Sequence, residues 1–291
     1  MKEITSAYIS VIIPCHNGQL FISETINSVL SQTFQNFEII IINDGSTDDT
    51  ANVINKFKDS RIVHLNKINS GVSDSRNKGL QVSKGDYVLF LDSDDILSFD
   101  FLEKRILFLS KHPNLGFCSS KVIKIDANGN KIHDKTWRGV ASNILQEILS
   151  YNSEIITCPS NYLFRKEILT KHELIFCTEL SSSADRYFLI ELSNYTKGGI
   201  ITNGGELFYR VHNASMSNKL TINLIKDNLL FQKKILQLKI VPKSLRKEFN
   251  FKTNYIFAGS YFRLRKLPES IWFSIIAFYH SPIEFFKQLS K

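Results

Sequence analysis

The stretch YVLFLDSDD, residues Tyr87–Asp95, joins an apolar run to three carboxylates. Its first five residues have the composition of a buried β-strand. Asp92, Asp94 and Asp95 follow, and carboxylates this close raise one another's pKa unless a cation or several donors hold them. Hard divalent ions such as Mg²⁺ and Mn²⁺ take oxygen ligands. The stretch therefore predicts a strand end that holds a metal-bound phosphate. The alternative is that Asp94 or Asp95 caps a helix beginning near Ser98.

Earlier in the chain, short apolar runs alternate with helical patterns. The predicted strands are Ile9–Ile13, Phe37–Ile42, Ile62–Leu65 and Tyr87–Leu91, and helical spacing covers residues 22–30 and 53–57. Continuous Val/Ile/Leu strands are typical of a parallel sheet with helices on both faces. Ligands of such sheets bind at the carboxyl ends of the strands. The polar clusters at residues 14–17, 43–46 and 92–95 all follow predicted strands, which makes this edge the expected site.

The elements are less regular beyond Phe99. The pattern predicts a helix to about Lys111, a strand over Phe117–Ile125, a hairpin turn at Asn128-Gly129, a helix over about Val140–Tyr151, a segment Ile155–Arg165 after a loop, a helix over Arg186–Leu192, and strands at Ile200-Ile201 and Leu207–Val211. The sequence thus predicts an α/β protein with a mainly parallel central sheet flanked by helices.

Composition limits the class of protein. The chain has 291 residues, of which 43% are apolar, enough for a sizeable core. Its four cysteines are scattered without paired metal spacing, which favours a reducing compartment. The N-terminus lacks the basic start and apolar run of a secretory signal. We therefore expect a cytoplasmic protein.

The C-terminal quarter carries the basic character. From Lys219 onward there are 14 Lys plus Arg against 4 Asp plus Glu, whereas the formal charge of the whole chain is +8. The pattern from about Leu220 is mostly helical and includes the apolar run Ser270–Pro282, too short for a spanning helix of about 20 residues. Flanking cations suit an anionic membrane surface; the alternative is a helix packed on the rest of the protein. No nucleic-acid-binding signature accompanies the charge, so nucleic acid is not an expected partner.

Common phosphate-binding loops are missing. No Gly-x-Gly-x-x-Gly follows the first strand, and there is no Walker-type Gly-Lys-Ser/Thr loop. Acidic and amide groups at successive strand ends can instead hydrogen-bond a base and ribose and hold a diphosphate through a metal. This set fits a sugar nucleotide.

These residues resemble the family 2 glycosyltransferases with the GT-A fold. The resemblance covers about Tyr8–Leu109 and is weaker over Ile155–Ser217 and absent from the tail. It rests on SVIIPCHN (10–17), SVLSQT (28–33), NDGSTD (43–48), NSGVS with RNKG (69–73 and 76–79) and DSDD (92–95). Asp74 departs from the family pattern, because a small residue is commoner there.

The resemblance implies a role for each nucleotide-binding residue. The base would stack and bond at Pro14 and Asn17, and Asp44 would accept a hydrogen bond from the imide N–H of the base. An imide favours a UDP-sugar, with a dTDP-sugar as the second choice. Arg76 would lie near the base and phosphates; the alternative is a surface charge on a helix.

The acidic cluster resembles the DXD motif of the family. Asp92 would contact the ribose or the metal, Ser93 belongs to the same nucleotide-sugar-binding motif, and Asp95 would orient the donor sugar. Asp94 would be the main ligand of Mn²⁺ or Mg²⁺. His212, in YRVHNASMS (209–217), would help to hold the metal or the diphosphate; the alternative is a structural histidine.

The family usually inverts the anomeric carbon, which requires a carboxylate to take the proton of the acceptor hydroxyl. The resemblance implies Asp185 for this role, although the first acid of the family's acidic pair is here Ala184. The alternative is that Asp185 only caps the helix that follows.

The sequence therefore predicts a metal-dependent, inverting glycosyltransferase of the hexosyltransferase type. It would pass a sugar from a UDP-sugar to a hydroxyl of a growing, lipid-linked glycan in bacterial surface polysaccharide or lipopolysaccharide synthesis, at the inner face of the membrane. We expect a GT-A domain over residues 1–218, with a nucleotide-sugar half (1–110) and an acceptor half (111–218), and a basic helical extension over 219–291.

Two other functions are alternatives to this prediction. A catalytically inactive GT-A scaffold or glycan-binding protein has only Ala184 in its favour. A sugar-1-phosphate nucleotidyltransferase would need a glycine- and lysine-rich N-terminal loop, which is missing.

Overall fold

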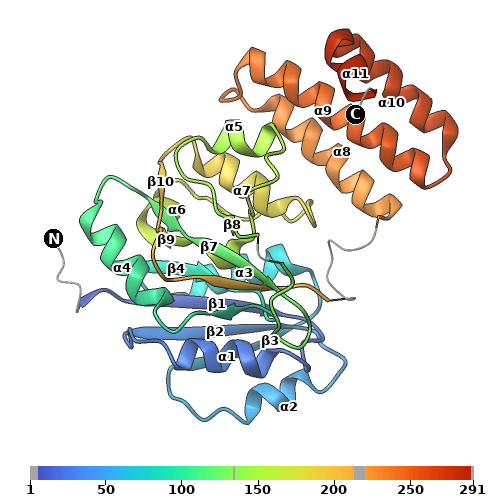
Figure 1. The fold of residues 1–291 in the computed structure, drawn as a ribbon. Coiled ribbons are helices and arrows are strands. Elements are labelled where there is room, and N and C mark those ends of the chain that lie inside the picture. Colours follow the sequence, from blue (N-terminus) through green and yellow to red (C-terminus); the bar gives the residue numbers. More distant parts are fainter. Residues whose placement is uncertain (1–5, 134, 213–219, 290–291) are drawn as a thin grey trace.

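A computed structural model describes residues 6–133, 135–212 and 220–289 (Figure 1). Its centre is a seven-stranded sheet in the order β10-β6-β9-β4-β1-β2-β3. Strands β1, β2, β3 and β4 are parallel, and β9 is antiparallel to its neighbours β4 and β6. The strands are β1 Ile9–Cys15, β2 Phe37–Asp44, β3 Ile62–Lys67, β4 Tyr87–Phe90, β6 Phe117–Ser119, β9 Leu163–Arg165 and β10 Gly198–Ile200.

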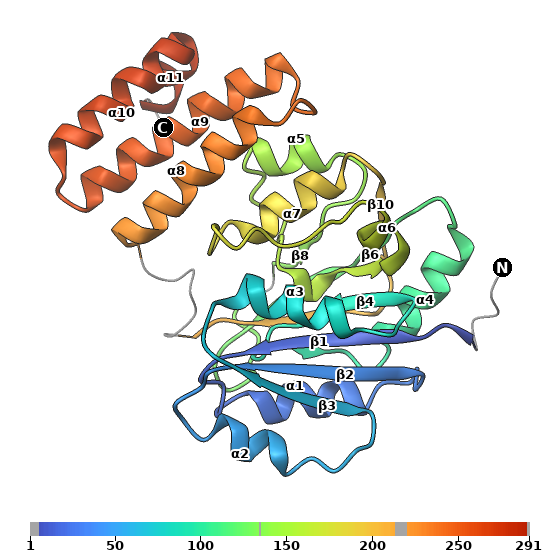
Figure 2. The same ribbon diagram turned by 180° about the vertical axis from the view of Figure 1, so that it is seen from behind.

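The central strands are apolar on both faces because each face meets a separate core. Ile12, Ile40 and Phe90 point into one core, which includes Leu80 of helix α3 (Val72–Val82). The alternate residues, such as Val11, belong to the other core. That core lies against α1 Ile22–Leu30, α2 Thr50–Asn55 and α4 Phe101–Lys111. The predicted parallel sheet covered by helices is confirmed (Figures 1 and 2).

A second sheet of four strands has the order β5-β11-β7-β8. Its strands are β5 Ile96–Leu97, β7 Lys121–Ile125, β8 Trp137–Arg138 and β11 Leu207–Arg210. The single strand predicted over Phe117–Ile125 is wrong, because the chain leaves the central sheet after Ser119 and enters the second sheet at Lys121. The buried Ser120 at this break bonds Arg105 and the carbonyl of Gly205. These side-chain contacts replace the strand pairing there.

Helices from residues 144–192 cover the other end of the sheet. They are α5 Ile144–Leu149, α6 Lys166–Lys171 and α7 Ala184–Leu192, with a 3₁₀ turn η2 at Pro159–Asn161. The segment predicted over Ile155–Arg165 therefore becomes a loop, a 3₁₀ turn and the short strand β9. Helix α7 begins at the residue before Asp185, which places that carboxylate in the first helical turn.

The C-terminal lobe consists of α8 Ile222–Gln237, α9 Lys243–Arg263, α10 Leu267–His280 and α11 Pro282–Leu289. The predicted helical extension is confirmed. Phe231 of α8 and Phe249 of α9 belong to the same core as α3 and α7, so the lobe is attached to the rest of the molecule by apolar packing. Among the described helices, none is both long enough and apolar enough to cross a membrane.

The lobe projects on the side of the sheet where β1 ends, as both ribbon views show (Figures 1 and 2). It therefore overhangs the edge at which the sequence places the site. Residues 213–217 of the predicted YRVHNASMS element, and the predicted boundary at 218, lie outside the described residues.

Candidate active site

A cavity of about 290 Å³ opens at the carboxyl ends of β1, β2 and β4. This edge collects side chains from distant segments because parallel strands all end there. The residues that line it are Pro14, Cys15, His16, Asp44, Val72, Ser75, Arg76, Asp92, Ser93, Asp94, Ser181, Ser182, Asp185 and Tyr209. Seven of the ten predicted site residues are among them.

Asp44, at the end of β2, anchors the loop that leads into α3. Its carboxylate accepts the backbone N–H groups of Ser70 at 2.9 Å and of Gly71 at 2.8 Å, and it pairs with Lys67. Oδ1 therefore has two donors and Oδ2 has one, which leaves one acceptor position on Oδ2 for a ligand. Lys67 also lies 2.8 Å from Asp74, the residue that departs from the family pattern. The structure thus gives Asp74 a partner that also contacts Asp44.

The turn after β2 is held by Asn17. Its side-chain oxygen accepts the backbone N–H of Thr47 at 2.8 Å, and its own N–H donates to Ser46. Gly45 is required there, since its φ is +65° and an added Cβ would lie 2.8 Å from the backbone nitrogen of Asn69. Asn17 does not line the cavity. Its observed contacts instead hold the turn after β2 in place.

Arg76 on α3 bridges two carboxylates in the cavity. Its guanidinium donates to Asp92 and to Asp185, each at 2.7 Å, and lies 5.0 Å from the ring of Phe176. Arg76 is only 3% exposed. A buried guanidinium with two carboxylates is held firmly, because any other orientation would leave charge unpaired. The alternative that Arg76 is a surface charge on a helix is therefore wrong.

Asp185 has the electrostatics of a proton acceptor. Burial raises the pKa of its carboxyl to about 6, with the nearby Asp92 adding to the rise and the Arg76 guanidinium opposing it. The neighbouring Ala184 is fully buried in the apolar core, so the side chain at that position faces away from the cavity. The single carboxylate of the Ala184-Asp185 pair is thus the one that lines the cavity.

The loop before α7 is fixed by Asp227 of the C-terminal lobe. The Asp227 carboxylate accepts the N–H of Ser181 at 2.6 Å, the hydroxyl of Ser182 at 2.7 Å and the N–H of Ser183 at 2.9 Å. Ser181 and Ser182 line the cavity. The sequence did not single out Asp227, because an isolated acid in a basic helix gives no signal of a contact 46 residues away.

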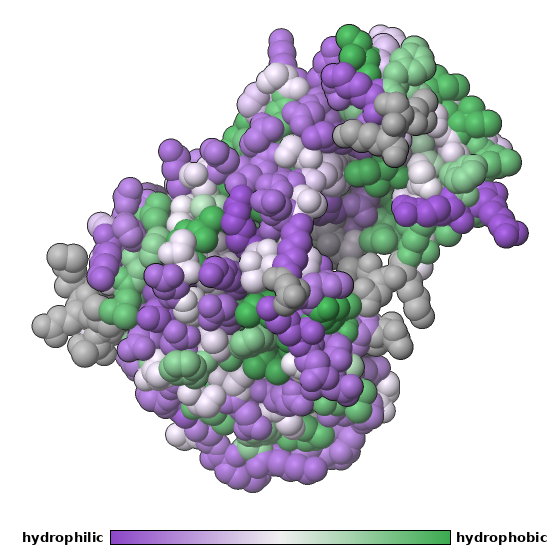
Figure 3. Space-filling model, viewed as in Figure 1, coloured by the Kyte–Doolittle hydropathy of each residue, from purple (hydrophilic) through white to green (hydrophobic). Residues whose placement is uncertain are grey.

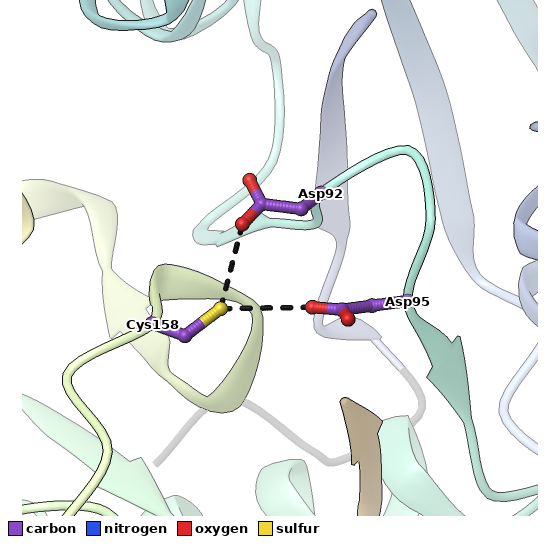
Figure 4. A group of neighbouring side chains, drawn as sticks. All are labelled: Asp92, Asp95 and Cys158. Carbon is purple, nitrogen blue, oxygen red and sulfur yellow. Dashed lines mark hydrogen bonds between the residues drawn. The ribbon is translucent and has the colours of Figure 1, made fainter. Parts of the chain in front are cut away.

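Asp92 and Asp95 meet at the thiol of Cys158 (Figure 4). The Sγ atom lies 3.4 Å from Asp92 Oδ2 and 3.6 Å from Asp95 Oδ2, and the three side chains form a possible metal-binding group. Burial raises the pKa of Cys158 well above its usual value, and the two carboxylates add to the rise. A neutral thiol is a weak donor and a poor ligand for hard cations. We therefore interpret this group as buried hydrogen bonding.

Asp95 differs most from its predicted position. Its side chain is 0% exposed, and its Oδ1 accepts the backbone N–H of Arg210 at 3.0 Å. The carbonyls of Ser93 and Asp95 both lie 2.9 Å from the hydroxyl of Thr25. Asp95 therefore connects the acidic loop to β11 from behind the cavity, and direct contact with a donor sugar does not fit this burial.

Asp94 and His212 are the pair of side chains most suitable for binding a metal ion. His212 Nε2 lies 2.9 Å from Asp94 Oδ2. Burial and the charge of Asp92 raise the pKa of Asp94, and His212 opposes the rise. Arg210, two residues before His212, is fully buried and donates to the carbonyl of Asp94 at 2.9 Å. The Asp94 carboxylate suits Mn²⁺ or Mg²⁺, and a cation would relieve the crowding of the acids. His212 itself does not line the cavity.

The family model described as "Glycosyl transferase family 2" matches residues 10–172. A curated relative, the poly(ribitol-phosphate) beta-N-acetylglucosaminyltransferase TarP of Staphylococcus aureus, is 32% identical over 228 residues, which are 77% of this chain and 68% of the relative. Three bacterial proteins described as uncharacterized glycosyltransferases are 37–39% identical, and this chain spans 22–50% of their length.

Solved structures share the fold. The S. aureus TarS 1-349 complex with UDP-GlcNAc has a TM-score of 0.67 at 18% identity, covering 94% of this chain and 92% of that chain. The mannosyltransferase PcManGT from Pyrobaculum calidifontis, in complex with GDP-Man and Mn²⁺, has a TM-score of 0.62 at 15% identity, covering 97% and 78%. The predicted GT-A fold is confirmed.

Proposed function

Since the chain belongs to glycosyl transferase family 2 and is a glycosyltransferase, we propose that it is a metal-dependent, inverting enzyme that uses a UDP-sugar. The observation that carries this proposal is an array of three side chains. The guanidinium of Arg76 contacts both Asp92, an acid of the predicted DXD motif, and Asp185, the candidate base. The array lines one wall of the cavity, so the donor and acceptor sites would meet there.

UDP is the proposed nucleotide of the donor. The remaining acceptor position on Asp44 Oδ2 can receive the imide N–H of uracil, while Pro14 lines the same end of the cavity. Thymine has the same imide, so a dTDP-sugar remains the second choice. The TarS complex with UDP-GlcNAc supports a UDP-sugar by similarity of fold.

The residues present fit a divalent cation. We propose that Asp94 and His212 hold Mn²⁺ or Mg²⁺, with Asp92 as the adjoining carboxylate. Asp92 already accepts from Arg76 on one oxygen and from Cys158 on the other, so it is the weaker candidate ligand. A bound cation would supply Lewis-acid neutralisation of the charge that develops on the leaving diphosphate. The PcManGT complex with Mn²⁺ supports this assignment by similarity of fold.

Asp185 would act as the general base. Its Oδ1 accepts from Arg76, and we assign Oδ2 to the acceptor hydroxyl. As the acceptor oxygen bonds to the anomeric carbon and the bond to the diphosphate breaks, the hydroxyl proton passes to Asp185. Arg76 favours the ionised form of Asp185 against its burial, so the base is available near neutral pH.

The proposed acceptor is a hydroxyl of a growing, lipid-linked glycan in bacterial surface polysaccharide or lipopolysaccharide synthesis, at the cytoplasmic face of the membrane. TarP is described as a poly(ribitol-phosphate) beta-N-acetylglucosaminyltransferase, and this description supports a polymeric acceptor.

A panel of UDP-, dTDP- and GDP-sugars tests the proposal through metal-dependent hydrolysis, in which water replaces the acceptor. We expect release of UDP from at least one UDP-sugar with Mn²⁺ or Mg²⁺. Asp185→Asn should lower turnover by about 10²–10⁴-fold, the usual contribution of a general base. Glu248→Gln on α9, remote from the cavity, is the control for general effects of removing a carboxylate.

Turnover of dTDP- or GDP-sugars alone would contradict the donor assignment. Full activity of Asp185→Asn would contradict the assigned base.

A further inference from the structure

Helix α10 exposes an apolar surface that the other described residues of the chain leave uncovered. At 100° per residue its exposed side chains cover an arc of about 140° with no charged residue. This outer stripe consists of Leu267, Ile271, Trp272, Ile275, Phe278 and Tyr279. Phe286 of α11 extends the stripe, because its ring lies 5.8 Å from that of Phe278. An exposed helix face of a globular protein is normally polar. We therefore expect the stripe to be covered by a binding partner or a surface.

The inner face of α10 packs closely against α9. Its buried residues are the small Ser270 and Ala277, and its Phe273 stacks on Tyr261 of α9 with ring centroids 5.4 Å apart. Small residues let the two helices approach closely. The largest side chains, including Trp272 at 61% and Tyr279 at 83% exposure, are turned outward. Figure 3 shows hydrophobic residues gathered along the outer edge of the C-terminal lobe.

Basic residues lie at both ends of this stripe, and two of them, Lys266 and Lys287, are also paired with Glu269 and Glu284. Arg263, Arg265 and Lys266 are exposed directly before its first residue, and Lys287 follows Phe286. Residues 220–289 contain 12 Lys plus Arg and 4 Asp plus Glu. Hydrophilic residues lie at the tip where α9 turns into α10 (Figure 3). Aromatic side chains between cations match an interface of headgroups and acyl chains, where cations meet anionic lipids.

We propose that the outer stripe docks the protein on an anionic membrane surface without crossing it. The lobe projects on the side where β1 ends, which is also the side of the cavity (Figure 1). Docking would bring the strand-end edge toward the surface that displays a lipid-linked acceptor. That consequence for the acceptor rests on the proposed function, whereas membrane binding itself does not.

Trp272 provides a direct probe, because the chain has only one other tryptophan. In the full chain carrying Trp137→Phe, Trp272 emission should shift to the blue with vesicles of 30% phosphatidylglycerol in phosphatidylcholine, and much less with phosphatidylcholine alone. Ile271→Gln/Ile275→Gln/Phe278→Gln keeps Trp272 and should lose this shift. The control Leu20→Gln/Ile132→Gln/Ile175→Gln, three exposed apolar residues elsewhere, should keep it.

The cations are tested separately. Arg263→Gln/Arg265→Gln should weaken partition to anionic vesicles about 10- to 30-fold, at roughly 1 kcal/mol per cation near the surface. Lys111→Gln/Lys171→Gln on the other half of the molecule should have little effect.

Absence of a shift at low salt, or an unchanged shift in the triple stripe variant, would overturn the proposal. Self-association that the triple variant abolishes, without vesicle binding, would assign the stripe to a second copy of the chain instead. UDP titration of the same variants distinguishes this failure from failure of the proposed function, because nucleotide binding should be unchanged in all of them.

Discussion

At the residue scale, Arg76 sets the spacing of the acidic groups in the cavity. Its two 2.7 Å contacts place one positive charge between Asp92 and Asp185. Without that charge, the two carboxylates would face each other in a buried setting, where ionisation is costly. The planar fork of a guanidinium can serve both acids at once, whereas an ammonium is a single point charge. Arg76 is therefore expected to position the base as well as to contact the donor.

Arg76→Lys tests this dual role. We expect kcat to fall by about 10–100-fold, because lysine cannot hold both carboxylates in their present orientation. Circular dichroism and thermal unfolding should show a folded protein. The substitution Arg61→Lys, at a surface pair with Asp59, is the matched control. Equal kcat in wild type and Arg76→Lys would argue that the bridge has no catalytic role.

The pH dependence of transfer follows from Asp185. Its pKa of about 6 lies above the ordinary value of 3.8, so the base gains a proton as pH falls through 6. We expect kcat/KM to be flat above pH 7 and to fall about tenfold per unit well below pH 6. A pH–rate profile with a UDP-sugar checks this. If the fall began only below pH 4, an unperturbed carboxyl would be the base and the assignment to Asp185 would fail.

The sequence could predict the acids of the cavity because they follow apolar strands in short, recognisable motifs. It could not predict what holds them. Arg76 and Asp185 are 109 residues apart, and Cys158, the residue before the 3₁₀ turn η2, contacts Asp92 from a segment that has no motif. The sequence also could not show that Asp95 is turned inward while Asp94 faces the cavity, since the path of a loop depends on contacts such as those of Thr25 and Arg210.

At the element scale, α8 controls the start of α7. Asp227 is largely buried, which opposes its ionisation, but the hydrogen bonds from Ser181–Ser183 hold its pKa below the usual value. Arg186 of α7 also bonds Asn228 of α8 and lies 4.5 Å from the ring of Phe231. The C-terminal lobe thus fixes the loop that contributes Ser181 and Ser182 to the cavity.

Asp227→Asn should lower the free energy of unfolding by about 1–3 kcal/mol, the range for hydrogen bonds to a charged group. An amide keeps the size but offers one acceptor oxygen for three donors. Because the folded pKa of Asp227 is lowered, its contribution is complete well above pH 4 and is lost as pH falls through that folded pKa. Urea unfolding at pH 7 and pH 3 measures both effects. Equal stability of wild type and variant at pH 7 would contradict a stabilising role for the Asp227 hydrogen bonds.

Some elements differ from the prediction for a common reason. The run over Phe117–Ile125 has uniform strand character, but the bonds of Ser120 with Arg105 and Asn161 divide it between two sheets. Helix α3 has a polar composition from Ser73 to Lys78, since its buried face includes Arg76. Local pattern predicts an element well when burial is apolar, and less well where buried polar networks decide the path.

At the scale of the whole molecule, the α/β class, the parallel sheet and the basic helical C-terminal region were predictable from periodicity and charge. The attachment of that region was not, because Phe231, Leu245 and Phe249 join the core of α3 and α7 only in three dimensions. Deletion of α10 and α11 alone should therefore affect folding less than deletion of the whole lobe.

Truncation after Leu264 should leave a folded protein that binds UDP, because α8 and most of α9 keep their contacts with the domain. A chain truncated before α8 should show no cooperative unfolding transition, because it lacks core aromatic residues and the hydrogen bonds of Asp227. Thermal unfolding of both truncated chains beside the full chain checks this. A stable, UDP-binding chain ending before α8 would show that the lobe is dispensable.

Titration of the purified protein with UDP, with and without Mn²⁺, tests the central claim most directly, in wild type and in Asp94→Ala. The account predicts tight binding of UDP to wild type only with the metal, and at least tenfold weaker binding to Asp94→Ala. The Glu248→Gln control should bind as wild type does. Binding that is equally tight without metal, or unchanged in Asp94→Ala, would contradict a metal-dependent UDP-sugar site at the end of β4.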